Sequence, residues 1–343
     1  DRQHNQAGGP DERIVRQGGY PRIPPPERTG STMTARPLTL HVGLPKAGST
    51  TLQQNLFHRL PGTAYHAIRR KAGPHDEASP FGGVVRNRKA APSVAPDIMQ
   101  KLDHVDATSL KSDIPAFRAW FRSARDAMPA DRDLVSEERF CDHLGPGLRQ
   151  RADLLRALFG PATVLMVIRR PEALMSSTFF QERRFVRYGL SRGANLDAWL
   201  GAALDHADHF LSPLQMVRYD VMAEMFGAAF GHENVVVAPL EWLSADPPRF
   251  AERLSTAFGR PGPEIEALLT VHGRAENTRN AGALIGNVRH NGVRQVVREL
   301  LAASQSRHIR PETARRLAAF AAPGIARIAE RQNLPLAELG YPV

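Results

Sequence analysis

The sequence predicts an α/β fold, with a mostly parallel central sheet flanked by helices in three layers. Three apolar runs support this prediction, at residues 38–43, 162–168 and 235–240. The run at 162–168 is apolar at almost every position, which is typical of a parallel strand buried on both faces. Helical patterns lie between the runs, near 113–128 and 219–229, as connections between parallel strands require.

The composition excludes some classes of function but does not select one. The 343 residues carry 45 Lys and Arg against 35 Asp and Glu, a net charge of +10, which favours anionic ligands in general. The single cysteine, Cys141, excludes an internal disulfide framework and a cysteine-based metal cluster. No apolar run approaches the roughly 20 residues that span a bilayer, and no secretory signal pattern opens the chain. We therefore expect a cytoplasmic protein without an integral membrane segment.

The chain divides at Met33. Residues 1–32 are rich in Gly, Pro, Gln and charge and lack apolar periodicity, so we expect them to be disordered. Residues 33–343 are expected to form the α/β domain. Within it, the stretch 61–112 is rich in Pro and Gly, and its length suggests acceptor binding or a lid.

The first candidate site follows the first strand. Residues 45–51 read Pro-Lys-Ala-Gly-Ser-Thr-Thr, and a helical pattern with Leu52 and Leu56 comes next. Backbone amides, three hydroxyls and the Lys46 ammonium thus converge on a helix N-terminus, which suits an anion. The usual nucleotide-triphosphate loop has its lysine after the second glycine, whereas Lys46 precedes Gly48. The alternative is a small-residue helix cap beside a surface lysine.

The second candidate site follows the strand at 162–168. That strand runs into Arg169, and a helix begins at Pro171 and carries Ser177, eight residues after the arginine. A guanidinium offers a planar, permanently charged fork to phosphate oxygens, and a serine hydroxyl adds a short donor. The alternative is an arginine at a strand end beside an ordinary helical serine.

Two carboxylates follow a third predicted strand. We expect residues 133–140 to form a strand that leaves Glu137 and Glu138 at the end facing the ligand crevice of an open sheet. Strand alternation would place these two side chains on opposite faces, so that only one points into the crevice. The alternative is a surface carboxylate paired with a nearby arginine.

The two loops, in this order, resemble those of the PAPS-dependent sulfotransferases of bacterial type, which have a P-loop-like fold and use 3′-phosphoadenosine 5′-phosphosulfate (PAPS). The resemblance covers roughly residues 36–260 and is specific at the two loops. It implies that Lys46 contacts the bridging oxygen of the phosphosulfate, and that Arg169 and Ser177 hold the 3′-phosphate. It also implies that the 5′-phosphate is bound by Ala47, Gly48, Ser49, Thr50 and Thr51. No metal is required by this scheme.

The sequence departs from the family pattern at two places. The cytosolic small-molecule branch carries a base histidine in a Lys-Thr-His run, where this chain has Ser136 followed by two glutamates. In other branches of the family, including glycan-modifying ones, the arrangement resembles this one, with a glutamate in the place of the base. We therefore expect Glu138 to be the base, and Glu137 is the second candidate. The Arg-Lys-Gly loop of the cytosolic branch is missing, and we expect it to be replaced by Arg274, Asn277 and Arg279.

The resemblance implies transfer of a sulfuryl group to a hydroxyl or amine of a small-molecule or glycan acceptor, with carbohydrates, lipids and secondary metabolites all open. A nucleotide-dependent phosphotransferase is one alternative, but it would need a lysine after the glycine and an aspartate for Mg²⁺. A non-catalytic binder of nucleic acid or polyanion would need a basic stripe interleaved with aromatics, whereas the arginines here are dispersed, so we expect no nucleic-acid partner. A domain that binds the nucleotide without turnover, and any oligomeric state, stay open.

Overall fold

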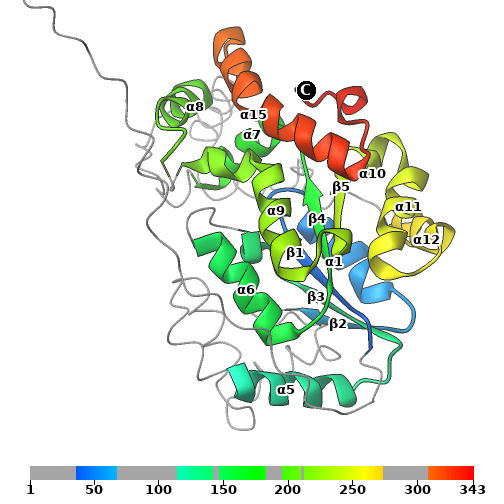
Figure 1. Cartoon of the computed structure of the whole chain (residues 1–343). Coiled ribbons are helices and arrows are strands. Elements are labelled where there is room, and N and C mark those ends of the chain that lie inside the picture. The colour runs from blue at the N-terminus through cyan, green and yellow to red at the C-terminus, as the bar shows by residue number, and fades with distance from the viewer. Residues whose placement is uncertain (1–35, 68–113, 142–146, 183–194, 210–211, 273–307) are drawn as a thin grey trace, which may run out of the picture. The chain divides into compact units, whose positions relative to one another are not determined.

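The computed structural model describes residues 36–67, 114–141, 147–182, 195–209, 212–272 and 308–343. Its centre is a five-stranded sheet in the order β2-β3-β1-β4-β5, in which every pair of neighbours is parallel (Figure 1). The strands are β1 (Leu38–Gly43), β2 (Thr63–Ala67), β3 (Arg132–Ser136), β4 (Thr163–Ile168) and β5 (Val235–Pro239). The predicted α/β class with a parallel sheet is therefore confirmed.

Helices pack against the sheet in two groups. On one face α9 (Tyr219–Phe230) contacts β4 and β5, α6 (Gly147–Phe159) packs beside α9, and α5 (Ile114–Asp126) packs on α6 (Figure 1). On the other face α11 (Pro247–Phe258) contacts β4 and β5, and α12 (Gly262–His272) packs against both α11 and α1 (Ser49–Asn55). This division follows from right-handed crossovers, because the chain leaves β1 toward β2 and then returns past β1 to β4.

The remaining described helices lie around this frame. They are α7 (Pro171–Glu182), α8 (Leu196–Asp205), α10 (Trp242–Ala245) and α15 (Pro311–Gln332), with short 3₁₀ turns η2 (Phe57–Arg59), η4 (Glu138–Cys141), η6 (Pro213–Val217), η7 (His232–Asn234) and η8 (Leu336–Leu339). The long helix α15 packs against α7, α8 and α9. The C-terminal part of the chain thus returns to the helices that follow β4.

The apolar runs form the strands because both faces of the central sheet are covered. Every residue of β1 and β5 is buried, and so are five of the six residues of β4. Covering helices contribute matching apolar faces, such as Phe250, Leu254 and Phe258 on α11, which are fully buried. The middle position of β1 makes its carboxyl end the place where the strand order reverses, which is where open α/β sheets bind ligands.

Two sequence expectations need correction. The stretch 61–112 is not loop throughout, because residues 63–67 form β2 at the edge of the sheet, paired with β3. The strand expected at 133–140 ends at Ser136, and a 3₁₀ turn begins at Glu138, so the argument from strand alternation does not apply to the two glutamates. The predicted disordered segment 1–32 lies outside the described residues, so the structure does not test that expectation.

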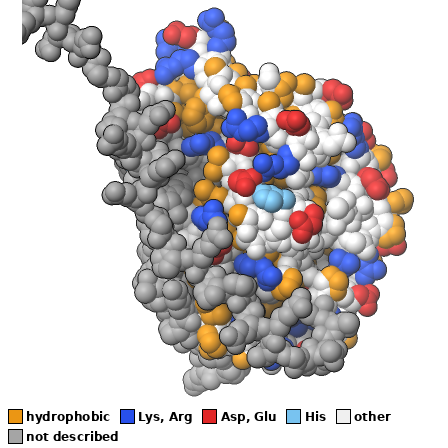
Figure 2. All heavy atoms as spheres, in the orientation of Figure 1, with side chains coloured by type: hydrophobic (Ala, Val, Ile, Leu, Met, Phe, Trp, Pro, Cys, Tyr) orange, Lys and Arg blue, Asp and Glu red, His pale blue; other side chains and the backbone are white. Residues whose placement is uncertain are grey.

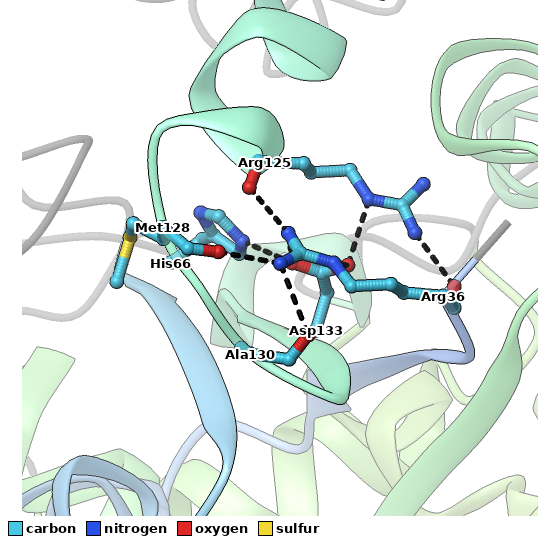
Figure 3. Close-up of polar contacts among 6 residues, drawn as sticks. All are labelled: Arg36, His66, Arg125, Met128, Ala130 and Asp133. Carbon is cyan, nitrogen blue, oxygen red and sulfur yellow. Dashed lines mark hydrogen bonds and ion pairs between the residues drawn. The ribbon is translucent and has the colours of Figure 1, made fainter.

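The start of β3 is held by a buried ion cluster (Figure 3). Asp133 is fully buried and accepts hydrogen bonds from Arg36 at 2.9 Å and 3.2 Å and from Arg125 at 2.7 Å, and His66 Nε2 lies 2.9 Å from its Oδ1. Burial alone would raise the pKa of Asp133. The hydrogen bond with His66 and the charges of Arg125 and Arg36 outweigh burial, so the pKa lies below its usual value.

This cluster lies at the amino end of β3. The loops of the candidate site follow the carboxyl ends of the strands, at the opposite end of the sheet. It joins Arg36, two residues before β1, His66 of β2 and Arg125 near the end of α5 to one carboxylate (Figure 3). We therefore interpret Asp133 as a structural residue rather than as part of the candidate site.

Candidate anion-binding site

The loop from β1 to α1 makes a tight left-handed turn. Lys46 and Gly48 both have positive φ, at 66° and 79°, and the Ala47 amide donates to the Leu44 carbonyl at 3.2 Å. The Leu44 amide donates to the Val167 carbonyl of β4 at 3.1 Å, which fixes the loop to the neighbouring strand. A side chain on Gly48 would place its Cβ 2.5 Å from Leu240 Cδ1, so the glycine permits a close approach as well as the turn.

The predicted loop residues divide by accessibility. Ala47, Ser49 and Thr51 are buried, and the Ser49 hydroxyl donates to the Leu44 carbonyl at 3.1 Å inside the loop itself. Lys46 and Thr50 are half-buried. The first amides of any α-helix have no partner within the helix, so the first turn of α1 offers backbone donors beside these side chains. An arriving anion would meet these amides, Lys46 and Thr50, whereas Ser49 shapes the turn.

The structure joins this loop to the second predicted site. Arg169 follows β4 and donates from Nη1 to the main-chain carbonyl of Lys46 at 3.0 Å, although 123 residues separate the two in sequence. The main chain of Arg169 is itself held, because the Tyr219 hydroxyl donates to its carbonyl at 2.5 Å. The pairing of β1 with β4 is what brings the two segments together. The Arg169 guanidinium and the main chain of Lys46 are therefore in contact at the point where the strand order reverses.

Ser177 lies on α7, the helix that begins at Pro171 directly after Arg169 and Arg170. Its side chain is half-buried, in contrast to the neighbouring Thr178, which is buried and donates to the Leu174 carbonyl at 2.9 Å. That the Ser177 hydroxyl donates a hydrogen bond to the 3′-phosphate stays a prediction. The other predicted members of the site, Arg274 and Asn277, lie outside the described residues, as does Arg279.

The two glutamates follow β3 directly. The Glu137 amide donates to the His41 carbonyl at 3.1 Å, which extends the pairing of β3 with β1 by one residue, and Glu138 opens η4. Gly43, the last residue of β1, lies against the Glu138 main chain, because a Cβ at Gly43 would be 2.9 Å from the Glu138 carbonyl oxygen. Glu137 is 6% exposed and Glu138 is half-buried, so Glu138 is the more accessible of the two.

A buried polar cluster beneath the loop was not foreseen from the sequence. His41 of β1 is fully buried, its Nδ1 lies 2.8 Å from the Ser136 hydroxyl oxygen, and Gln53 of α1 donates to the same oxygen at 2.9 Å. Burial lowers the pKa of His41 to about 3, so the imidazole is neutral near pH 7. His41 and Ser136 are polar residues next to the buried apolar residues Val42 and Val135, and this contrast is the signal that could have found the cluster.

Among the residues that the structure describes, no helix has the length and apolar character that crossing a bilayer demands. Within the same residues, no three or more His, Cys, Asp and Glu side chains come together as candidate metal ligands.

The whole chain has few recognisable relatives among known proteins. No protein-family model matches it, and no curated protein matches it. A search of solved structures finds similarity to a sulfotransferase from Alicyclobacillus acidocaldarius, with 16% sequence identity and a TM-score of 0.46 over 89% of this chain and 98% of that one.

Proposed function

We propose that this protein is a PAPS-dependent sulfotransferase that moves the sulfuryl group to a hydroxyl or amine of a small-molecule or glycan acceptor. The observation that carries the proposal is the 3.0 Å hydrogen bond from Arg169 to the Lys46 carbonyl. Two motifs whose sequence order and chemistry resemble the 5′- and 3′-phosphate sites of this family are adjacent in space. A donor with phosphates on both sides of its ribose requires that adjacency.

In the proposed complex, the amides of Gly48, Thr50 and Thr51 bind the 5′-phosphate, and Lys46 reaches the bridging oxygen. The guanidinium of Arg169 and the hydroxyl of Ser177 bind the 3′-phosphate. Arginine suits this position because its fork matches phosphate oxygens and it keeps its charge at any working pH.

Transfer is an in-line displacement at sulfur. The acceptor oxygen or nitrogen forms a bond to sulfur while the bond from sulfur to the bridging oxygen breaks, and adenosine 3′,5′-bisphosphate leaves. Negative charge grows on the bridging oxygen, so the Lys46 ammonium stabilises the transition state more than the ground state. The acceptor proton passes to a carboxylate, for which we propose Glu138, the more accessible of the two glutamates beside Gly43.

The competing functions find less support in the site. For a phosphotransferase, β4 would be expected to end in a carboxylate for Mg²⁺, and it is followed by Arg169 instead. For a polyanion binder, cations would be expected to gather in one stripe. Figure 2 shows both signs of charge mixed over α9 and α15, where Asp220 pairs with Arg327 and Glu224 with Arg331.

Calorimetric titration tests the proposal. We expect adenosine 3′,5′-bisphosphate to bind in preference to AMP and to ATP with Mg²⁺. Arg169→Ala should weaken bisphosphate binding about 10- to 150-fold, the loss expected for hydrogen bonds to a charged group. It should weaken AMP binding less, because AMP lacks the 3′-phosphate and is affected only through the contact of Arg169 with the loop. Arg327→Ala, which removes an exposed cation on α15, is the matched control and should leave the affinity unchanged.

Preference for ATP with Mg²⁺ would refute the proposal in favour of a phosphotransferase. Equal losses from Arg169→Ala and Arg327→Ala would indicate non-specific attraction of anions by the net positive charge. Lys46→Ala separates binding from catalysis, since it should lower kcat for sulfuryl transfer more than it weakens bisphosphate binding.

A further inference from the structure

The C-terminal segment of the chain reaches the strand end that carries Arg169. After η8, the amide of Tyr341 donates to the Leu336 carbonyl at 3.1 Å, which closes a compact turn. Tyr341 is 4% exposed, and its hydroxyl donates to Oε2 of Glu241 at 2.6 Å. Burial and the charge of Glu241 raise the pKa of Tyr341 well above its usual value, so this hydroxyl stays protonated and donates.

The other oxygen of Glu241 holds the main chain beside Arg169. The amide of Arg170 donates to Oε1 of Glu241 at 2.9 Å, and the Arg170 Nε lies 3.7 Å from the same oxygen. Glu241 is placed for this role by the strand before it, because the Leu240 amide donates to the Ile168 carbonyl at 2.8 Å. One carboxylate therefore bridges a residue near the C-terminus and the peptide that joins Arg169 to Arg170.

The peptide group between Arg169 and Arg170 is bound on both sides. Its carbonyl accepts from the Tyr219 hydroxyl at 2.5 Å, and its amide donates to Glu241. Burial raises the pKa of Tyr219 well above its usual value, so this hydroxyl also stays a donor. Two tyrosines from distant parts of the chain thus fix one peptide group, and the Arg169 side chain extends from it to Lys46.

We propose that Tyr341 and Glu241 are positioning residues of the anion site, so that the C-terminal segment completes it. They touch no ligand; they fix the Arg169–Arg170 peptide and, through it, the direction of the Arg169 guanidinium. The inference rests on the proposed function for the identity of the ligand. The contacts of Glu241 with Tyr341 and with the Arg170 amide exist without any ligand.

Hydrogen–deuterium exchange tests the contact without any ligand. Tyr341→Phe keeps the buried ring and removes only the hydroxyl. We expect faster exchange in peptides that cover residues 164–175, where the Arg170 amide lies, because the Glu241 carboxylate loses one of its two anchors. Arg331→Ala, which removes an exposed ion pair on α15, is the control and should leave these peptides unchanged. Unchanged exchange in Tyr341→Phe would overturn the inference.

Binding measurements test the consequence. Tyr341→Phe should weaken binding of adenosine 3′,5′-bisphosphate about 3- to 10-fold and binding of AMP less, since only the bisphosphate carries the 3′-phosphate proposed to meet Arg169. In the Arg169→Ala background the same substitution should have no further effect. A loss of equal size in both backgrounds would overturn the positioning role and indicate general destabilisation.

The two proposals can fail separately. If the wild-type protein bound no bisphosphate while Tyr341→Phe still accelerated exchange, the proposed function would be wrong and the fixed peptide would stand. If the wild type bound it through Arg169 while Tyr341→Phe changed neither exchange nor affinity, the proposed function would stand and the positioning role would be wrong.

Discussion

The Arg169 guanidinium donates to the Lys46 carbonyl, with 3.0 Å between Nη1 and the oxygen. One side chain therefore has two tasks: it holds the β1–α1 loop from the neighbouring strand, and its remaining donors can face an anion. A lysine keeps the charge and lacks the planar fork. Arg169→Lys should therefore raise the dissociation constant of adenosine 3′,5′-bisphosphate about tenfold or more in calorimetry.

The control for this substitution is Arg316→Lys, at an exposed ion pair with Asp205. It should bind the bisphosphate like the wild type. Full affinity in Arg169→Lys would show that charge alone matters at this position, and that the fork does not.

The general base can be assigned by isosteric substitution. Glu138→Gln should lower kcat for sulfuryl transfer about 100-fold or more with little change in KM, because the carboxylate acts on the proton and not on donor binding. Glu137→Gln should have the smaller effect on kcat, since Glu137 is 6% exposed. The opposite ranking of the two variants in steady-state kinetics would exchange their roles.

Gly43 permits the close approach of the loop to the segment after β3. Its φ is 111°, and a Cβ there would lie 2.9 Å from the Glu138 carbonyl oxygen and 3.2 Å from the Glu138 Cα, both of which are backbone atoms. Gly43→Ala should lower both the free energy of unfolding and kcat. Gly160→Ala is the matched control, since its φ is also positive, at 81°, and its Cβ would meet open space.

Chemical denaturation would separate the two effects. Gly160→Ala should lose about 1 kcal/mol from backbone strain alone, and Gly43→Ala should lose more because the backbone atoms of Glu138 must move. Equal losses in the two variants would contradict the crowding argument.

Asp133 is a structural charge (Figure 3). Asp133→Asn removes the partner of two arginines at a fully buried position, so we expect a loss of about 3–5 kcal/mol in the free energy of unfolding. Asp131→Asn breaks an exposed pair with Arg260 and should lose less than about 1 kcal/mol. When the concentrations of folded protein, measured by circular dichroism, are made equal, Asp133→Asn should bind adenosine 3′,5′-bisphosphate with the same affinity as the wild type.

His41 predicts a pH dependence of stability. Its folded-state pKa of about 3 lies below the ordinary 6.5, so as the pH falls from 6.5 toward 3 the unfolded chain takes up a proton that the folded protein does not. Stability therefore falls with decreasing pH in this window. Between pH 7 and pH 4.5 the contribution of His41 amounts to about 2–3 kcal/mol.

Urea unfolding at the two pH values measures this contribution. His41→Asn keeps a polar group near Ser136 and does not titrate. Its free energy of unfolding should be lower than that of the wild type at pH 7, and it should fall less on acidification. An identical fall in the two proteins would show that His41 accepts its proton in the folded state.

The sequence by itself determined the fold class and the chemistry of the two loops. Both follow from local sequence, because alternating and continuous apolar residues indicate which strands are buried. The charge of Lys46 and Arg169 and the backbone freedom of Gly48 are properties of the residues themselves and do not depend on the fold. The edge strand β2 was missed because Thr63–Ala67 mixes small and polar residues and has no strong apolar run. The end of β3 at Ser136 was missed because the 3₁₀ turn after it has no strong local signal.

The tertiary structure decided which residues meet. The strand order puts β1 between β3 and β4, and this order brings Lys46 to Arg169 and Gly43 to Glu138. Tyr341 meets Glu241 across 100 residues of sequence. Such contacts depend on how elements that are distant in sequence pack together. The partner of a single tyrosine or glutamate therefore cannot be predicted from the sequence around it.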